Sequence, residues 1–306
     1  MTHSPARPQR LRRVQLAVPG SSEKMMRKAA ASAADHVFLD LEDAVAPSQK
    51  AEARKKIIAA LTTYDWGRKT RCVRINDFST KYAYRDIIEV VTGARSSLDT
   101  LMLTKVKTPA DILFADTLLN QLEQDIGLET PIGLEALIEE VEGLQNVEAI
   151  AKSSPRLEAL VFGMGDFSAS MGVLIKPDGK VGPYPGDVWH YSRFRMVMAC
   201  RAAGIDPVDG PYADFRDPDG YTEEASRALT LGCVGKWAIH PAQIDWALSV
   251  FTPDKDEVAR ARMLAAAYKE AEAQGLGAIQ VDGTMVDVAS IRMFGAILRK
   301  ADLIGM

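Results

Sequence analysis

The chain has 306 residues, of which 47% are hydrophobic, 25% charged and 7% aromatic, and its formal net charge is -4. This composition is typical of a water-soluble enzyme, and the acidic balance disfavours a nucleic-acid-binding protein, which would carry a basic excess. No apolar run approaches the roughly 20 residues that a membrane-spanning helix needs. The basic N-terminal stretch lacks the apolar segment of a signal peptide, so we expect a cytoplasmic protein with no membrane partner.

The cysteines and histidines exclude several kinds of site. Cys72, Cys200 and Cys233 are widely spaced and form no CxxC pair, so neither a disulfide framework nor a zinc site is predicted. The four histidines form no metal-spaced cluster, and no GxSxG motif is present. Covalent catalysis by serine or cysteine is therefore disfavoured, whereas a Schiff base on Lys105 stays open.

Short runs rich in β-branched residues alternate with segments of helical periodicity. The strand-like runs are Val14–Val18, His36–Leu41, Arg71–Ile75, Thr100–Leu103, Pro131–Leu137, Leu157–Phe162, Pro207–Val208 and Gly235–Ile239. The helix-like segments are Glu23–Ala34, Gln49–Leu61, Tyr82–Val91, Pro109–Leu122, Glu140–Ala151, Val188–Ala203, Thr222–Leu231 and Pro241–Val250. Strict alternation predicts a parallel sheet. Eight such units predict a (β/α)8 TIM barrel over residues 1–250.

The sequence changes character after Val250. A Phe-Thr-Pro-Asp stretch interrupts the helical pattern, and an Ala-rich helix is predicted over Glu257–Gln274. A Gly-rich turn, a short β-like piece at Ala278–Val281 and a last helix follow. A closed barrel does not need these elements, so residues 251–306 are predicted to form a C-terminal helical lid or oligomerisation arm.

Ionisable or hydrogen-bonding side chains follow seven of the eight predicted strands. In chain order they are Asp40, Glu42 and Asp43, then Arg74, Lys105, Glu139, Asp166, Asp209 and His240. TIM barrels build their active sites at the C-terminal ends of the strands. The joint pattern therefore favours a catalytic mouth over the ordinary polarity of loops.

Glu139 and Asp166 are candidate ligands for a hard cation. Asp166 follows the Gly-rich strand end Phe162–Gly165, where glycines allow the backbone to approach a ligand closely. Two carboxylates leave coordination positions open for water and substrate oxygens, which is how Mg²⁺ is usually held. The structural alternative is a helix N-cap for Asp166 and a first-turn helix-dipole partner for Glu139.

An arginine at a barrel mouth needs an anionic partner. Arg74 either pairs with Asp40, Glu42 or Asp43, or meets a substrate oxygen that gains negative charge, and the two roles are compatible. For Lys105 a structural ion pair is favoured. These carboxylates and Lys105 are accordingly assigned a supporting role around Arg74.

Several motifs in fixed order carry a resemblance to a known family. They are Leu16-Ala-Val-Pro-Gly-Ser21, Phe38-Leu-Asp-Leu-Glu-Asp-Ala-Val45, Val73-Arg-Ile-Asn76, Ile138-Glu139, Phe162–Asp166, Lys236-Trp-Ala-Ile-His-Pro241 and Val286-Asp-Val-Ala-Ser-Ile-Arg-Met293. Together they resemble the citrate lyase β-subunit-like branch of the HpcH/HpaI aldolase family, from about Arg13 to Ile297. The stretch 209–220, which contains Asp-Gly-Pro-Tyr-Ala-Asp-Phe, extends the similarity to the malyl-CoA lyases.

The resemblance implies a Mg²⁺-dependent lyase that cleaves or forms a carbon–carbon bond in a 3-hydroxyacyl-CoA thioester. Malyl-CoA or β-methylmalyl-CoA would give glyoxylate and acetyl-CoA or propionyl-CoA. Glu139 and Asp166 would bind Mg²⁺, for which Mn²⁺ could substitute, and Arg74 would stabilise the enolate oxygen. Asp287 would be the general acid/base, delivered into a neighbouring subunit's site within a homo-trimer or homo-hexamer. From the residues alone, Asp287 is instead a helix N-cap.

The resemblance also implies contacts to CoA and substrate from Lys28, Arg13, Gly165, Ile239 and Pro241. Three features depart from the family pattern. They are Lys24 in place of an arginine, Ala17 in place of an aromatic residue, and a short segment at Val173–Asp187 with a Lys-Pro-Asp-Gly turn. These departures concern the acyl group and CoA binding rather than the reaction class.

Four activities remain open on this scaffold. A citramalyl-CoA lyase would release pyruvate, and a malyl-CoA thioesterase would release free malate. A citrate lyase β subunit would use an acyl-carrier thioester, and a pyruvate-type aldolase would not need CoA.

Overall fold

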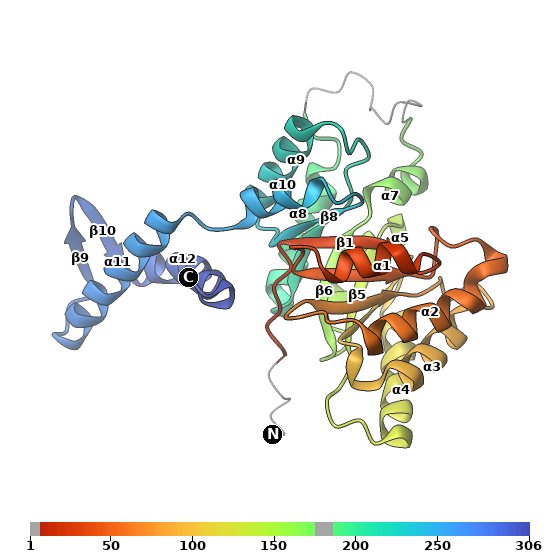
Figure 1. Cartoon of the computed structure of the whole chain (residues 1–306). Helices are drawn as coiled ribbons and strands as arrows, with labels where there is room; N and C mark the ends of the chain where they lie inside the picture. The colour runs from red at the N-terminus through yellow and green to blue at the C-terminus, as the bar shows by residue number, and fades with distance from the viewer. Residues whose placement is uncertain (1–6, 175–185) are drawn as a thin grey trace.

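The computed structural model describes residues 7–174 and 186–306. Its eight parallel strands close into a barrel in sequence order, with β8 pairing β1 (Figure 1). The strands are β1 (Val14–Pro19), β2 (His36–Asp40), β3 (Thr70–Arg74), β4 (Thr100–Leu103), β5 (Gly133–Ile138), β6 (Leu157–Phe162), β7 (Asp206–Asp209) and β8 (Gly235–Ala238). The predicted (β/α)8 fold is confirmed.

Helices cover the outside of the barrel. They are α1 (Glu23–Ala30), α2 (Lys50–Thr63), α3 (Ala83–Ala94), α4 (Pro109–Ile126), α5 (Val141–Gln145), α6 (Val147–Ala151), α7 (Met164–Met171), α8 (His190–Ala203), α9 (Pro218–Leu231) and α10 (Gln243–Phe251), with short 3-10 turns at Pro47–Gln49 and Arg95–Ser97. Because helices cover one face of each strand and the barrel interior the other, the strands are apolar nearly throughout. Every residue of β2, β5 and β6 is buried.

The sequence misjudged two helices. The predicted helix Glu140–Ala151 is divided at Asn146 into α5 and α6. Helix α7 was not predicted at all, because it begins after Gly163 with no side-chain cap and contains Gly165 in its first turn. Glycine and weak capping both lower helix propensity, so the segment looked like a loop.

The C-terminal residues fold into α11 (Lys255–Ala273), a hairpin of β9 (Ala278–Val281) and β10 (Thr284–Asp287), and α12 (Val288–Ile304). These elements project away from the barrel and form a small core of their own around Leu264, Tyr268 and Val286 (Figure 1). Helix α12 returns toward the barrel, where the Nζ of Lys300 donates to the carbonyl of Val234 at 3.3 Å. None of the helices within the described residues combines the length and apolarity needed to cross a bilayer.

Candidate active site

Arg74 is fixed at the barrel mouth by two carboxylates from the neighbouring strand end. It is the last residue of β3 and lies in register with Asp40, the last residue of β2. Its Nε and Nη2 atoms donate to the two Asp40 oxygens, both at 2.7 Å, and its Nη1 lies 3.2 Å from a Glu42 oxygen. Burial opposes ionisation of Asp40, but the Arg74 charge outweighs it and lowers the Asp40 pKa.

Aromatic rings form the floor beneath this arginine. The guanidinium carbon of Arg74 lies 5.7 Å from the ring centroid of Phe38 and 5.6 Å from that of Trp237. Both rings sit inside the barrel in one buried cluster. Cation–π attraction adds to the ion pair, so Arg74 is held in one orientation before any substrate arrives.

Lys105 connects this network to Glu139. Its Nζ donates to Glu42 at 2.5 Å, and its backbone N–H donates to a Glu139 oxygen at 2.8 Å. The predicted structural ion pair of Lys105 is thereby confirmed. The backbone of Lys105 has φ 50°, in the left-handed region that side-chain-bearing residues seldom adopt. This strained conformation points the N–H at Glu139.

Glu139 is buried immediately after β5 and is poorly compensated. Burial and the nearby Asp166 carboxylate raise the pKa of Glu139 to about 8. A Cβ at position 163 would lie 2.6 Å from the Cβ of Glu139 and 2.7 Å from its Oε2. Only glycine at 163 therefore leaves room for this carboxylate.

Asp166 is partly exposed in the first turn of α7. It is the third helical residue rather than the N-cap, which is Gly163, so the N-cap interpretation of Asp166 was wrong. Two carboxylates close enough for one to raise the pKa of the other are a donor set that suits a divalent cation. The side chains present therefore fit a Mg²⁺ site.

A second group of ligand-type side chains lies at the other end of the barrel and does not fit a metal. His36, Cys72 and Glu135 bring one potential ligand atom each within 4.8 Å of one another. The Glu135 oxygens, however, already accept from His36 at 2.9 Å, from Gln15 at 2.9 Å and from Arg12 at 3.3 Å. The guanidinium of Arg12 thus already supplies the positive charge that a metal ion would bring to Glu135.

Four further predicted residues border the mouth, and their binding roles stay predictions. Gly165 and Pro241 are exposed, Ile239 is 42% exposed, and both Ile239 and Pro241 follow β8. Asp43 is exposed on the loop after β2. Burial raises the Glu42 pKa, and the negative charge of Asp43 adds to this effect.

The residues at the rim of the mouth are less constrained. Lys24 and Lys28 lie exposed on α1, and Ala17 is partly buried on β1. The Lys-Pro-Asp-Gly turn of the short segment lies outside the described residues.

Two predicted residues are not brought to this mouth within one chain. Arg13 precedes β1, at the opposite end of the barrel, where it pairs with Asp35 at 2.7 Å and donates to Thr252 at 2.8 Å. Its assignment as a CoA contact of this site is therefore wrong. Asp287 is the last residue of β10, which belongs to the projecting C-terminal part (Figure 1). It is the N-cap of α12, where it accepts the Ser290 N–H at 2.9 Å.

Sequence reasoning missed a buried charge network behind the mouth. Asp209, at the end of β7, accepts from Lys236 at 2.6 Å and from Arg193 at 2.7 Å. Lys236 also donates to Glu224 at 2.6 Å. A lysine within the apolar strand Gly-Lys-Trp-Ala was the available signal, because a buried lysine needs a carboxylate.

The protein-family model described as HpcH/HpaI aldolase/citrate lyase matches residues 13–241. The chain belongs to this family. An L-malyl-CoA/beta-methylmalyl-CoA lyase of Cereibacter sphaeroides is 44% identical, with 98% of each chain covered. The mitochondrial citramalyl-CoA lyase of Rattus norvegicus is 35% identical, with 92% of this chain and 83% of the relative covered.

A solved structure of the family bears on the site. CitE from Mycobacterium tuberculosis, in complex with magnesium, acetoacetate and coenzyme A, aligns with a TM-score of 0.71 and 28% identity. The alignment covers 94% of this chain and 97% of CitE.

Proposed function

We propose that the chain is a Mg²⁺-dependent CoA-ester lyase that interconverts L-malyl-CoA or β-methylmalyl-CoA with glyoxylate and acetyl-CoA or propionyl-CoA. The 44% identity to a lyase of that name supports the substrate class. The observation that carries the proposal is the Glu139–Asp166 carboxylate pair, in which burial and mutual repulsion raise the Glu139 pKa, beside a rigidly held Arg74. Breaking the bond between C2 and C3 of a 3-hydroxyacyl thioester leaves a carbonyl on one fragment and an enolate on the other, so two sites of electrostatic stabilisation are needed.

Glu139 and Asp166 would hold the divalent cation. Bound there, Mg²⁺ or Mn²⁺ would polarise the carbonyl of the 2-oxoacid. Glu139 has one oxygen tied to the Lys105 N–H and the other facing Gly163, so its carboxylate is already oriented.

Arg74 would meet the enolate oxygen of the acyl-CoA fragment. Asp40 occupies the Nε and Nη2 positions and Glu42 faces Nη1. A guanidinium has five N–H groups, so each terminal nitrogen keeps one for a substrate oxygen. A cation held in this way stabilises developing charge without reorganising at the moment of reaction.

Asp287 would serve as the general acid/base from the arm of a neighbouring subunit, residues 251–306. The Ser290 backbone N–H, then its hydroxyl, lowers the Asp287 pKa, so the carboxylate is ionised at neutral pH and ready to take a proton. In the condensation direction it would take a proton from the acyl methyl or methylene carbon and then give it to the new alkoxide oxygen. In cleavage it would take the hydroxyl proton and give it to the enolate carbon.

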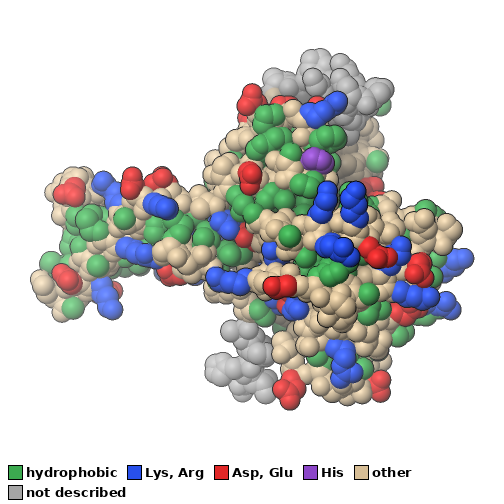
Figure 2. Space-filling model, in the orientation of Figure 1, with side chains coloured by type: hydrophobic (Ala, Val, Ile, Leu, Met, Phe, Trp, Pro, Cys, Tyr) green, Lys and Arg blue, Asp and Glu red, His purple; other side chains and the backbone are tan. Residues whose placement is uncertain are grey.

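The surface of the arm supports a homo-oligomer. Figure 2 shows apolar side chains on the projecting part, and Met285, Val288 and Met293 are 69%, 50% and 65% exposed. Apolar side chains gathered on one surface favour contact with another chain. A trimer or hexamer, in the cytoplasm where the three free cysteines stay reduced, completes the proposal.

One reaction tests the function. The protein is incubated with Mg²⁺, acetyl-CoA or propionyl-CoA, and glyoxylate or pyruvate, and products are identified by mass. Malyl-CoA or methylmalyl-CoA is the expected product. Citramalyl-CoA from pyruvate would favour the activity named for the Rattus norvegicus relative, free malate would favour a thioesterase, and no CoA-dependent product would refute the proposal.

Subunit mixing tests the neighbour's role. Asp287→Asn should abolish turnover while leaving CoA binding intact, and Asp282→Asn in the exposed hairpin turn is its control. Because the two defects lie in different parts of a shared site, oligomers assembled from Asp287→Asn and Glu139→Gln chains should regain activity. Mixed oligomers that stay inactive would place Asp287 outside the site.

A further inference from the structure

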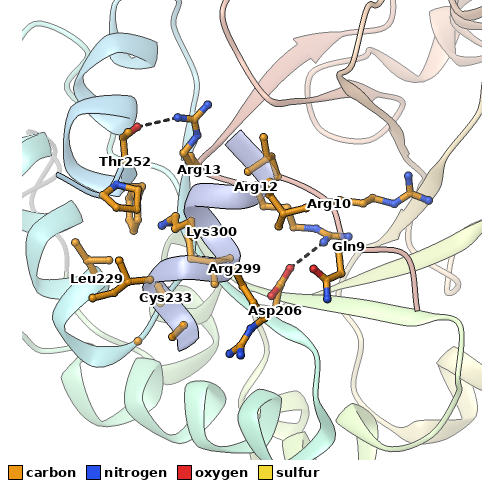
Figure 3. A pocket seen from close by; sticks show the side chains of 18 of the residues that line it. Gln9, Arg10, Arg12, Arg13, Asp206, Leu229, Cys233, Thr252, Arg299 and Lys300 are labelled. Carbon is orange, nitrogen blue, oxygen red and sulfur yellow. Dashed lines mark hydrogen bonds and ion pairs between the residues drawn. The ribbon is translucent and has the colours of Figure 1, made fainter. Parts of the chain in front are cut away.

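A cavity of about 930 Å³ lies between the N-terminal end of the barrel and helix α12 (Figure 3). Its walls come from residues 7–13, 201–206, 232–234, 250–254 and 296–303. The first three segments precede β1, β7 and β8, so this cavity is at the end of the barrel opposite the mouth. Its volume is that of a small-molecule site.

Basic side chains outnumber acidic ones in this cavity. The basic lining residues are Arg7, Arg10, Arg12, Arg13, Arg201, Arg299 and Lys300, against Glu158, Asp206, Asp254 and Glu257. Figure 3 shows Lys300 and Arg299 reaching in from α12, with Arg12 and Arg13 on the facing segment. The chain as a whole is acidic, so this local excess of positive charge is not a property of the average surface.

Part of this charge is already compensated. Arg12 pairs with Glu158 at 2.6 Å and with Asp206 at 3.0 Å, and Arg10 pairs with Glu158 at 2.8 Å. Arg13 pairs with Asp35, outside the cavity lining. These three arginines therefore occupy Glu158, Asp206 and Asp35, and the lining carboxylates outside these pairs are Asp254 and Glu257.

Four of the basic side chains form no ion pair within the described residues. Across residues 7–174 and 186–306, no ion pair joins Arg7, Arg201, Arg299 or Lys300 to a carboxylate. Arg201 donates to the Gly232 carbonyl at 2.6 Å, and Arg7 donates only to backbone carbonyls. Carbonyls at helix ends bear partial charges, so these bonds satisfy the donors without neutralising a unit positive charge.

Lys300 is the most constrained of the four. It is half-buried, its Nζ lies 5.3 Å from the centroid of the Phe251 ring, and within the described part of the chain it donates only to the Val234 carbonyl. Burial, and then the charge of Arg13, lowers the Lys300 pKa to about 8. The negative charge of a bound anion would offset both effects and raise the Lys300 pKa.

The lining also contains apolar side chains. They are Ile205, Leu229, Val234, Val250, Phe251, Ile297 and Leu303. A ligand that matched both kinds of lining residue would have an anionic head and an apolar or ring-shaped body. We propose that this cavity binds a phosphorylated small molecule, its phosphate held by Lys300, Arg299 and Arg201 and its body against Leu229 and Phe251.

Occupancy would tie α12 to the barrel, because Lys300 and Arg299 belong to α12 and Arg201 to the end of α8. Asp287 is the N-cap of the same α12, so binding would also affect its placement. This coupling to turnover rests on the proposed function, whereas binding itself does not.

Calorimetric titration with phenyl phosphate, in EDTA and without substrates, tests the site. We expect saturable binding, at least about 5-fold tighter than that of inorganic phosphate because the ring adds apolar contact. Lys300→Gln and Arg201→Gln should each weaken binding about 10-fold, and Lys300→Arg should retain it. Lys269→Gln on α11, the same change at an exposed position outside the lining, is the control.

Protonation gives a second readout. At pH 8 binding should take up part of a proton as the Lys300 pKa rises, detected by repeating the titration in buffers of different ionisation enthalpy. This uptake should vanish in Lys300→Gln. Circular dichroism checks separately that the variant is folded, so that a lost proton uptake can be assigned to the missing lysine.

Three results would overturn the proposal. They are no saturable binding below about 10 mM, equal weakening by Lys300→Gln and Lys269→Gln, and binding that Lys28→Gln or saturating CoA abolishes while Lys300→Gln does not. The last would place the anion at the mouth. None of these outcomes bears on whether the protein is a lyase.

Discussion

Two buried glutamates on one strand of the barrel have opposite electrostatic environments. Glu135 lies within β5 and Glu139 immediately follows it, and both are at most 2% exposed. Burial opposes ionisation of Glu135, yet His36 and then Arg12 outweigh it and hold its pKa far below the usual value. At Glu139, burial prevails and the pKa rises to about 8.

The difference indicates a structural role for Glu135 and a ligand-binding role for Glu139. Glu135 has a hydrogen-bonding partner for each of its oxygens, so the fold has already used its charge. Glu139 has one backbone donor and a like-charged neighbour, Asp166. A buried carboxylate whose positive neighbours do not offset its burial is a candidate for binding a ligand cation.

The largest effect is expected at Glu139. Glu139→Gln should lower kcat by at least about 10³-fold and abolish the response to Mg²⁺, because it removes a metal ligand. The melting temperature should change by only a few degrees, since little compensated charge is lost. Glu140→Gln, at the partly exposed next position, is the matched control; a metal-stimulated Glu139→Gln enzyme would refute the metal assignment.

Glu135→Gln should show the reverse pattern. It removes the charge that faces His36 and Arg12, although Arg12 keeps Glu158 and Asp206, so the expected loss is about 1–3 kcal/mol. Urea unfolding at pH 7 measures this loss. Because the folded-state pKa of Glu135 is depressed, its contribution is present above the ordinary glutamate pKa of 4.5 and is lost as pH falls. The gap between wild type and variant should therefore narrow below about pH 4.5; a gap independent of pH would contradict this assignment.

Arg74→Lys tests whether geometry as well as charge matters at the mouth. A single ammonium cannot hold both Asp40 oxygens, face Glu42 and still meet a substrate oxygen. We expect kcat to fall about 10²–10³-fold in the lyase assay. Arg71→Lys, near the start of the same strand, should leave kcat within about twofold, and equal losses in the two variants would remove Arg74 from the mechanism.

The smallest effect is expected at Lys300. Its folded-state pKa of about 8 is below the usual 10.5, so between these values the unfolded chain binds more protons and stability rises with pH. Lys300→Met should be more stable than wild type at pH 7, by about 1 kcal/mol after allowing for solvent screening. This advantage should shrink from pH 8 to 10; a constant advantage would indicate better apolar packing alone.

The barrel and its mouth could be predicted because both follow from local patterns. Strand runs such as Thr100–Leu103 and Leu157–Phe162 matched the structure at both ends. Ionisable side chains directly after them converge because parallel strands end together. Helix α7 escaped prediction because its start at Gly163 carries no capping side chain.

Other features could not be obtained from local patterns. Arg13 was assigned through the family resemblance, although a residue that precedes a strand lies at the opposite end of the barrel from one that follows it. The cavity beneath the barrel joins Arg7, Arg201 and Lys300, which are far apart in the chain. In the proposed mechanism Asp287 comes from a second chain, which the sequence of one chain does not specify.

The joint between barrel and arm has a mechanical consequence. Helix α11 has 19 residues, so at 1.5 Å per residue it is a lever of about 28 Å. A tilt of about one degree at residues 252–254 would displace its far end by about 0.5 Å, the tolerance of a catalytic group. The hydrogen bond from Arg13 to Thr252 lies at this joint and limits its tilt. We therefore expect Thr252→Val to lower kcat although the residue is remote from the mouth.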